Sequence, residues 1–377
     1  MHPSSLLSYY PTFSILDEIV SYGDYNTLNI YIDLKNTLQT TYMEHAIINI
    51  IESTQNGRFY DTSVFSSVIS FLAFHKRYAM GRDIKINFYI FFESGQSYYH
   101  QNISKKYKVS RRIDDLYGLD NEKRELFFSV LQKNYTLIEK ACNKIPNVRV
   151  IRLHHLEADF VPYYLITRKK VDTSSNIAHI IYSNDHDLLQ CVMENVYVYQ
   201  KIMSKVKRIV KSGEVMEREL KKKNNLNDNI QPLALSIIGD PGDDVEGIKG
   251  IGPVTFLKCM HEVMKLIGSI DNLYDNVIQG NPIFNLSNLK IPNKNTQKII
   301  TEEQTTNKIS NNLKLVSFEL ISRAVENPSS MEMSEKSKYI DNTMFSGNLQ
   351  VNAEPLKTSL SKVDVELEHK ALEILFV

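Results

Sequence analysis

The sequence predicts an α/β fold with a mainly parallel central sheet flanked by helices. Five short segments, almost wholly apolar, have the length and composition of strands: 28–34, 84–92, 148–153, 177–183 and 196–199. Segments with helical spacing of apolar residues separate them, as in proteins whose strands alternate with helices. Because continuous apolar strands are typical of a sheet buried on both faces, we expect helices on both of its sides.

The helices follow in order between these strands. Apolar spacing predicts helices over 46–51 and 64–78 after the first strand, over 121–144 after the second and over 156–166 after the third. Beyond the fifth strand the pattern becomes helical. Residues 281–312 are rich in Asn, Lys, Thr and Pro, a composition typical of a linker or loop.

These observations divide the chain into five predicted parts. They are an N-terminal extension (1–28), an α/β domain (29–212), a helix–hairpin–helix subdomain (213–280), the linker or loop (281–312) and a helical C-terminal region (313–377).

Charge and cysteine content narrow the function classes. Lys plus Arg and Asp plus Glu both total 44, and this zero net charge argues mildly against a nucleic-acid partner. The bases cluster at 105–112, 201–211 and 221–223, however, and the local field governs contact with phosphate. Three widely spaced cysteines form neither a disulfide framework nor a zinc pattern. With no apolar run of membrane-spanning length and no signal-peptide features, we expect a cytoplasmic monomer without a membrane partner.

Carboxylates follow the ends of the first four predicted strands. Because the carboxyl ends of parallel strands meet at one edge of a sheet, these side chains should converge there. Each alone is also an ordinary turn or helix-capping residue. In chain order they are Asp33, Glu93, Glu157 with Asp159, and Asp185 with Asp187.

The stretch 237–252, IIGDPGDDVEGIKGIG, holds five of the chain's 14 glycines. Dense glycine lets backbone N–H groups lie close to a ligand, and such a hairpin between two helices suits one phosphate. Pro253 fits the first position of the second helix and Gly268 its end. Asp240 and Asp243 would join the acidic edge of the sheet from this hairpin.

The ligand type predicts the chemistry. So many carboxylates in one cleft would repel one another unless cations neutralised them. Oxygen ligands without His or Cys favour Mg²⁺ or Mn²⁺ over zinc. Two such ions support phosphodiester hydrolysis, since they activate a water and stabilise the leaving oxygen.

At this point the sequence is similar to a known family. GDPGDDVEGIKGIGPVT resembles the helix–three-turn–helix of the 5′ nuclease superfamily, a PIN-like fold that includes flap endonucleases and bacteriophage 5′→3′ exonucleases of the RNase H type. YSNDHDLLQ resembles that family's S-x-D-x-D-[LFM]-x-Q motif, LEADF its E-A-[DE]-[DA] motif, and YKVSR the Y-K-x-x-R of its helical arch, expected here near 95–120. The resemblance covers about residues 28–275, with departures at Glu93, Phe160, Asp244, Glu246 and Val254.

The resemblance implies a role for each matched residue. One Mg²⁺ would be held by Asp33, Glu93, Glu157 and Asp159, and the second by Asp185, Asp187 and Asp243, with Asp240 nearby. In the arch, Lys108 and Arg111 would act on the scissile phosphate as catalytic residues. Contacts with DNA would come from Tyr107, Arg112, Gly247, Gly250, Gly252, Thr255 and Lys258, and K⁺ would bind at the hairpin.

The resemblance implies a two-metal-ion 5′ nuclease, an exonuclease or a flap endonuclease. Its substrates would be DNA with 5′ ends, flaps or nicks, and RNA–DNA hybrids in primer removal. The phage-like motifs suggest a virus-encoded replication or repair enzyme with a single-strand-binding protein or clamp as partner. Two alternatives stay open. One is a structure-specific DNA-binding protein of the same fold that lost activity at Glu93 or Phe160; the other is a PIN-type ribonuclease, which lacks the glycine hairpin.

Overall fold

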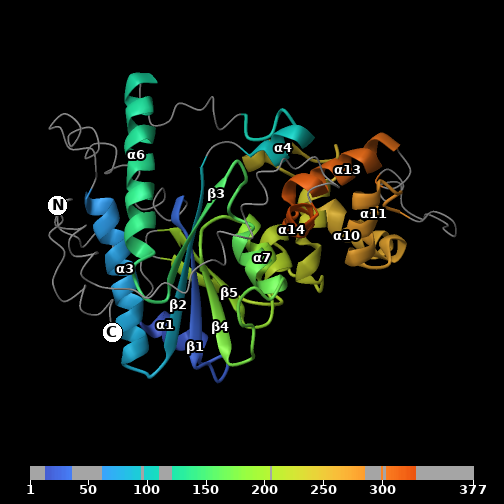
Figure 1. Ribbon diagram of the computed structural model, residues 1–377. Coiled ribbons are helices and arrows are strands. Elements are labelled where there is room, and N and C mark those ends of the chain that lie inside the picture. Colours follow the sequence, from blue (N-terminus) through green and yellow to red (C-terminus); the bar gives the residue numbers. More distant parts are fainter. Residues whose placement is uncertain are drawn as a thin grey trace.

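A six-stranded sheet lies at the centre of the molecule (Figure 1). The computed structural model describes residues 13–35, 62–94, 97–109, 121–203, 206–284, 299 and 303–327. The sheet has the order β3–β2–β1–β4–β5–β6, and every neighbouring pair except β5–β6 is parallel. Its strands are β1 (Thr27–Asp33), β2 (Lys85–Ser94), β3 (Val148–His154), β4 (Ile177–Tyr182), β5 (Val196–Met203) and β6 (Val206–Val210).

The predicted α/β fold with a mainly parallel sheet is confirmed, and strands β1 to β5 lie close to their predicted positions. Strand β6 is not among the predicted strands. Its sequence, VKRIV, lies in a basic segment and resembles a charge cluster, and charged residues are typical of edge strands because they discourage pairing with other chains. The predicted helix over 46–51 lies outside the described residues.

Helices cover both faces of the sheet. Side chains alternate along β1, so Ile30 and Ile32 enter one apolar core and Tyr31 enters the other. The first core also contains residues of α1 (Phe13–Val20), α3 (Thr62–Met80) and α6 (Asn121–Cys142). The second contains residues of α7 (Val161–Thr167) and α14 (Phe318–Glu326). Helix α1 lies in the predicted N-terminal extension, yet its Leu16 and Ile19 are fully buried in the first core.

A second group of helices packs around its own core, and Figure 1 shows α10, α11, α13 and α14 gathered beside the sheet. It comprises α8 (Val215–Leu220), α9 (Gln231–Ile238), α10 (Pro253–Ile267), α11 (Ile270–Gln279) and α13 (Glu303–Val316). Helix α13 begins inside the segment predicted as a linker, because Ile309 and Leu313 pack fully buried in this core despite the polar composition around them. Across the residues described, no helix combines the length and hydropathy needed to cross a bilayer.

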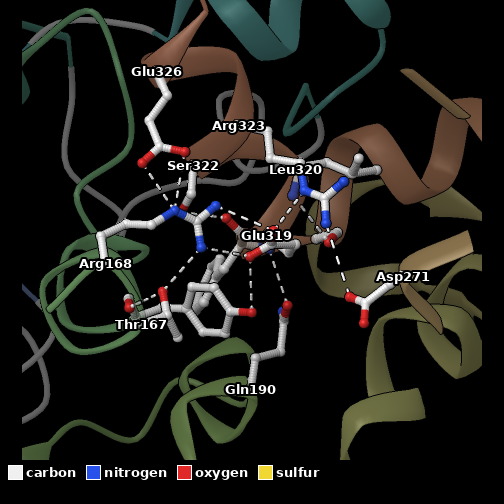
Figure 2. A network of polar contacts seen from close by, with 12 residues as sticks. Thr167, Arg168, Gln190, Asp271, Glu319, Leu320, Ser322, Arg323 and Glu326 are labelled. Carbon is white, nitrogen blue, oxygen red and sulfur yellow. Dashed lines mark hydrogen bonds and ion pairs between the residues drawn. The ribbon is translucent and has the colours of Figure 1, made fainter. Parts of the chain in front are cut away.

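Helix α14 joins the two groups through a network of charges (Figure 2). Arg168, at the end of α7, contacts Glu319 at 3.0 Å and Glu326 at 2.9 Å. On the other side Arg323 contacts Glu319 and, in α11, Asp275, both at 2.6 Å. Because Glu319 is only 12% exposed and accepts from two guanidinium groups, it fixes α14 against α7 and α11 together.

Candidate active site

The site lies where the sheet changes its direction of winding. Strands β2 and β3 follow β1 on one side, while β4 and β5 lie on its other side. In open parallel sheets, the crevice at the carboxyl ends of the strands beside this switch point is where ligands bind. Asp33 ends β1 there, and Ser183 follows β4. The Ser183 hydroxyl donates to Asp33 Oδ2 at 3.2 Å and accepts from the Asp185 N–H at 3.1 Å, which ties the two strand ends together.

Three aspartates meet at this point. One carboxylate oxygen from each of Asp187, Asp240 and Asp243 lies within 4.8 Å of the others. Asp187 opens a short 3₁₀ helix, η3 (Asp187–Cys191), whose apolar residues are buried against the sheet. The other two follow α9, in β7 (Gly239–Asp240) and η5 (Pro241–Asp243). We call these residues the three-aspartate cluster. All three are among the predicted metal ligands.

The electrostatics of the cluster favour a proton or a cation. Burial, and then the carboxylates of Asp185, Asp243 and Asp240, raise the pKa of Asp187 well above its usual range. Like charges at such separations cannot all stay ionised at neutral pH without a counter-charge. A divalent ion held by oxygen ligands would supply that charge.

Asp159 is a half-buried residue of the same site, and its charge acts on Asp187. Its Oδ1 is buried and has no hydrogen-bond partner among the residues that the structure describes. Burial, and then the neighbouring Glu157, raise its pKa well above the usual range of an aspartate. An unsatisfied buried carboxylate oxygen is costly for a fold, and a metal ligand is a common reason for one. The residues present therefore fit a divalent ion.

Glu157 has the opposite environment. Burial opposes its ionisation, but the Lys108 ammonium lies 2.8 Å and 2.9 Å from its two oxygens and lowers its pKa to about 2. Lys108 Nζ is also 3.0 Å from Asp243 Oδ2. Lys108 thus bridges two predicted metal ligands with its own positive charge. Its backbone has a φ of 53°, a left-handed conformation that costs a non-glycine residue about 1–2 kcal/mol, and its N–H donates to the Asp243 carbonyl.

Tyr107 is placed differently from its predicted role. The motif predicts a contact with DNA, but Tyr107 is only 5% exposed. Its hydroxyl lies 2.8 Å from Asp243 Oδ2 and 3.0 Å from Glu157 Oε2, and its ring stacks on the buried His100. The side chain therefore orients carboxylates instead of facing solvent.

Two residues of the site, Lys35 and Gln190, are not among the predicted site residues. Lys35 pairs with Glu93, so this predicted ligand has a cation beside it just as Glu157 does. A basic residue two positions after the strand-end Asp33 is the sequence signal for it. Gln190 belongs to the matched YSNDHDLLQ motif; its amide donates to the Val316 carbonyl at 2.8 Å and accepts from the Phe318 N–H at 3.0 Å. It thereby holds η3 against the junction of α13 and α14.

The capping alternative applies to Asp185 and also to Asp240, which is the N-cap of η5 and accepts from the Gly242 N–H at 2.9 Å. The Oδ1 of Asp185 accepts from the Asp187 N–H at 3.1 Å, a local turn contact. The Asp187 carboxylate instead belongs to the three-aspartate cluster. Phe160, where the family motif has a further acid, is fully buried in the second core and precedes α7. Arg111 and Arg112 lie outside the described residues.

The glycine hairpin lies between η5 and α10. A Cβ on Gly247 would come within 1.9 Å of the Ile238 carbonyl oxygen, so this glycine permits close packing of the chain on itself. Gly252, before Pro253 of α10, has open space around the position of a Cβ. Ile248 and Ile251 anchor the loop in the core.

Around this loop, the predicted DNA contacts are open to solvent to different degrees. Gly250 and Lys258 are exposed, while Gly252 and Thr255 are half-buried. Val254, which stands where the family has a base, is 53% exposed.

Fold and site together define a class of protein: an α/β chain with a carboxylate-rich edge at its switch point and a glycine hairpin beside it. No family model matches the chain. It is 31% identical over 136 residues to a 5′-3′ exonuclease of Aquifex aeolicus, a match that covers 35% of this chain and 41% of that one. A 5′-3′ exonuclease of Buchnera aphidicola is 25% identical over 213 residues, 52% of this chain and 68% of that one. The chain therefore spans less than half of the length of the Aquifex relative.

Solved structures share the fold. A bacteriophage T5 protein co-crystallised with metal ions superposes with a TM-score of 0.53 at 16% identity, over 84% of this chain and 99% of that one. A bacteriophage T5 flap endonuclease in complex with DNA and metal ions gives 0.51 at 16% identity, with the same coverage. The chain is therefore similar in sequence to 5′-3′ exonucleases and shares its fold with these bacteriophage T5 proteins, in agreement with the resemblance that its motifs carry.

Proposed function

We propose that this protein is a metal-dependent 5′ nuclease that hydrolyses phosphodiesters at the 5′ ends, flaps or nicks of DNA. The observation that carries the proposal is the three-aspartate cluster at the switch point of the sheet, with the unsatisfied oxygen of Asp159 beside it. The relatives named 5′-3′ exonucleases and the DNA-bound T5 flap endonuclease support the same reaction class.

The ligands of this site are all carboxylates, which favours Mg²⁺ or Mn²⁺. Asp33, Glu93, Glu157 and Asp159 would hold one ion, and Asp185, Asp187, Asp240 and Asp243 the other. Divalent ions, when bound, lower the barrier to hydrolysis by neutralising charge on the attacked phosphate. The contribution of the chain is to fix the carboxylates: Ser183 orients Asp33, and Tyr107 orients Glu157 and Asp243.

Lys108 would change partners during this reaction. Its ammonium lies between Glu157 and Asp243, so it neutralises the site when no other cation does. When ions take that role, we propose that Lys108 turns to the scissile phosphate, where its charge stabilises the transition state electrostatically. Release of its left-handed backbone conformation would favour this movement.

The hairpin would hold the duplex next to the site. Backbone N–H groups around Gly250 and Gly252, at the start of the long helix α10, suit one backbone phosphate. Lys258, exposed one turn into the helix, would add a second contact. A K⁺ ion at the hairpin and activity on RNA–DNA hybrids in primer removal are finer parts of the same proposal.

Purified protein incubated with 5′-labelled flap, nicked and hybrid substrates tests the proposal. We expect cleavage with Mg²⁺ or Mn²⁺ and none in excess EDTA. The alternative, a DNA-binding protein without activity, predicts binding of the same substrates with no cleavage in either ion. When a carboxylate of the site is changed to its amide, Asp172→Asn is the matched control. Asp172 is an exposed turn residue that precedes β4, at the edge of the sheet opposite to the site. Cleavage that persists in EDTA would contradict the metal-dependent mechanism.

A further inference from the structure

A pair of stacked rings, of which one is exposed and the other half-buried, lies beside the candidate active site. Tyr98, the first residue of α4 (Tyr98–Ile103), stacks on His155 with ring centroids 4.3 Å apart and an angle of 9° between the planes. The Tyr98 N–H donates to the His155 carbonyl at 3.0 Å, so backbone and rings are held together. Tyr98 is nevertheless 44% exposed.

This exposure is specific to Tyr98 within its helix. Its neighbours Tyr99 and His100 are buried, and they bond to the carbonyls of Lys314 and Leu315 at the end of α13. These contacts hold α4 in place without Tyr98. Within the described part of the chain, the Tyr98 ring is a member of none of the four apolar cores. Tyrosine rings are enriched at binding interfaces, because they combine an apolar face with a polar end.

Covalent geometry places the stacked pair next to the reaction. His155 precedes Glu157 by two residues, so their Cα atoms are at most about 7 Å apart. Successive nucleotides of a duplex strand rise about 3.4 Å each, and a base one to two steps from a phosphate near Glu157 would reach the rings. Lys105 and Lys106, both exposed, follow α4 and provide positive charge for a strand on this side.

We propose that Tyr98 and His155 form a stacking platform for an unpaired nucleobase next to the scissile phosphate. The inference rests on the proposed nuclease function and deepens it, because it assigns a place to the single-stranded part of the substrate. Stacking suits a substrate of any sequence, since every base has a π-face, and it requires a base that is not in a duplex stack. The pairing of Tyr98 with His155 orders the ring before the base arrives, which reduces the entropy lost on binding.

Fluorescence of 2-aminopurine tests the platform. The full chain carrying Asp187→Asn, in Mg²⁺, is mixed with flap substrates that have this base analogue at successive positions on either side of the junction. We expect quenching at one or two adjacent positions, retained in Tyr98→Phe and lost in Tyr98→Leu. Tyr22→Leu is the matched control, because Tyr22 is similarly exposed at 38% but precedes β1, at the opposite edge of the sheet.

Substrate affinity gives a second measurement. An abasic site at the quenched position should weaken binding by the Asp187→Asn protein about 5- to 100-fold, the range of one base–aromatic stack. The Tyr98→Leu double variant should not distinguish the base from the abasic site. Melting temperatures equal to that of the parent would show that the variants are folded.

The outcomes separate the two proposals. If the protein binds and cuts flap DNA but Tyr98→Leu still distinguishes a base from an abasic site, the platform is wrong and the nuclease proposal stands. If no position is quenched in the parent, the platform is equally wrong. A protein that neither binds nor cuts any 5′ substrate would overturn both proposals together.

Discussion

Glu93 and Glu157 each have a lysine beside them, whereas Asp187, Asp240 and Asp243 stand close to one another. The pKa shifts of Glu157 and Asp187 differ in the same way. Lys108 lowers the pKa of Glu157 to about 2 against the effect of burial, while burial and its acidic neighbours raise the pKa of Asp187. The glutamates are neutralised by the chain itself. In the three-aspartate cluster, Asp243 shares Lys108 with Glu157 at 3.0 Å, whereas Asp187 has a pKa raised by burial and by its acidic neighbours. We infer that the first divalent ion binds at this cluster, beside Asp187.

Of the substitutions that test this comparison, Asp187→Asn should have the largest effect on the cleavage rate. The change removes one charged ligand and keeps the shape of the side chain, so we expect cleavage to slow on the order of a thousandfold, which corresponds to about 4 kcal/mol of lost transition-state stabilisation. The same change should raise the melting temperature of the metal-free protein, because it removes repulsion within the cluster. Cleavage rates and metal-free melting curves of one variant measure both effects.

If Asp187 were only a helix cap, Asp187→Asn would have the opposite effects on stability and cleavage. Loss of a cap destabilises by about 1 kcal/mol and leaves chemistry intact. An Asp187→Asn protein that melts earlier without metal and still cuts at the parental rate would therefore remove Asp187 from the catalytic site.

Lys108→Met should show that the glutamate side depends on its own cation. Glu157 would keep the Tyr107 hydroxyl but would lose its cation. We expect the metal-free protein to lose about 1–3 kcal/mol of stability at neutral pH, a value reduced from that of a fully buried pair because Lys108 is 21% exposed. Glu157 has a lowered pKa in the folded state, so its contribution is present above its unfolded pKa and is lost as the pH falls toward 2.

The difference between parent and Lys108→Met should therefore disappear in acid. Urea unfolding of both proteins between neutral and acidic pH measures it. Lys105→Met is the matched control, because Lys105 is exposed in the same segment. If Lys108→Met unfolds at the same urea concentration as the parent at neutral pH, Lys108 is not the counter-charge of Glu157.

Metal affinity should depend on pH through the aspartates. The pKa values of Asp159 and Asp187 are raised, so part of their population is protonated where ordinary aspartates are ionised. A divalent ion must displace these protons, and its affinity should rise with pH until both groups are ionised. The stability of the metal-free protein should depend on pH in the opposite direction. As the pH falls through the raised pKa values of Asp159 and Asp187, the two groups take up protons and the free energy of unfolding increases.

Titration calorimetry of Mn²⁺ binding, in buffers of different ionisation enthalpy, counts the protons released. We expect a release that approaches two protons at the lower end of the pH range and declines as the pH rises. Affinity that stays constant from pH 5 to pH 8 would mean that neither aspartate is protonated in the metal-free site.

The sequence predicts the metal-ligand side of this comparison better than the lysine side. Apolar runs locate the strands, and parallel strands place their terminal residues at one edge, so the convergence of Asp33 with Asp185 follows from pattern alone. The lysine pairs depend on the path of the chain after each strand. No periodicity indicates that Lys35 turns toward Glu93, or that Lys108 enters the site instead of facing solvent.

At two further residues, Tyr107 and Phe160, the structure differs from the motif-based prediction because of distant parts of the chain. Tyr107 matches the arch motif as a surface residue, but its hydroxyl completes a buried set of carboxylates. Phe160 stands where the motif has an acid, and the structure shows that this position belongs to a core. Local sequence gives residue type and spacing, whereas burial at these positions is decided by elements far away in the chain.

The glycine hairpin differs from the acidic edge because its proposed contact with DNA uses backbone N–H groups. Gly252→Val should therefore give the smallest of the expected effects, and one confined to DNA affinity. Its φ of −99° suits any residue, and a Cβ there would meet nothing within 4 Å. Stability should therefore change by less than about 0.5 kcal/mol. If a phosphate approaches this backbone, the added side chain would separate the two, and we expect affinity for nicked duplex to fall about tenfold, or about 1.4 kcal/mol.

Gly247→Ala provides the contrasting control. Its Cβ would lie 1.9 Å from the Ile238 carbonyl oxygen, a contact that the fold cannot keep, so we expect a loss of stability of several kcal/mol, about 2–4. A duplex titration with each folded variant, beside its melting curve, separates the two kinds of glycine. Because Gly252 is free to change without strain, weakened binding at parental stability assigns the hairpin to DNA. A Gly252→Val protein that binds nicked duplex as tightly as the parent would leave the hairpin as a turn with no part in binding, and the acidic edge would have to hold its substrate by other contacts.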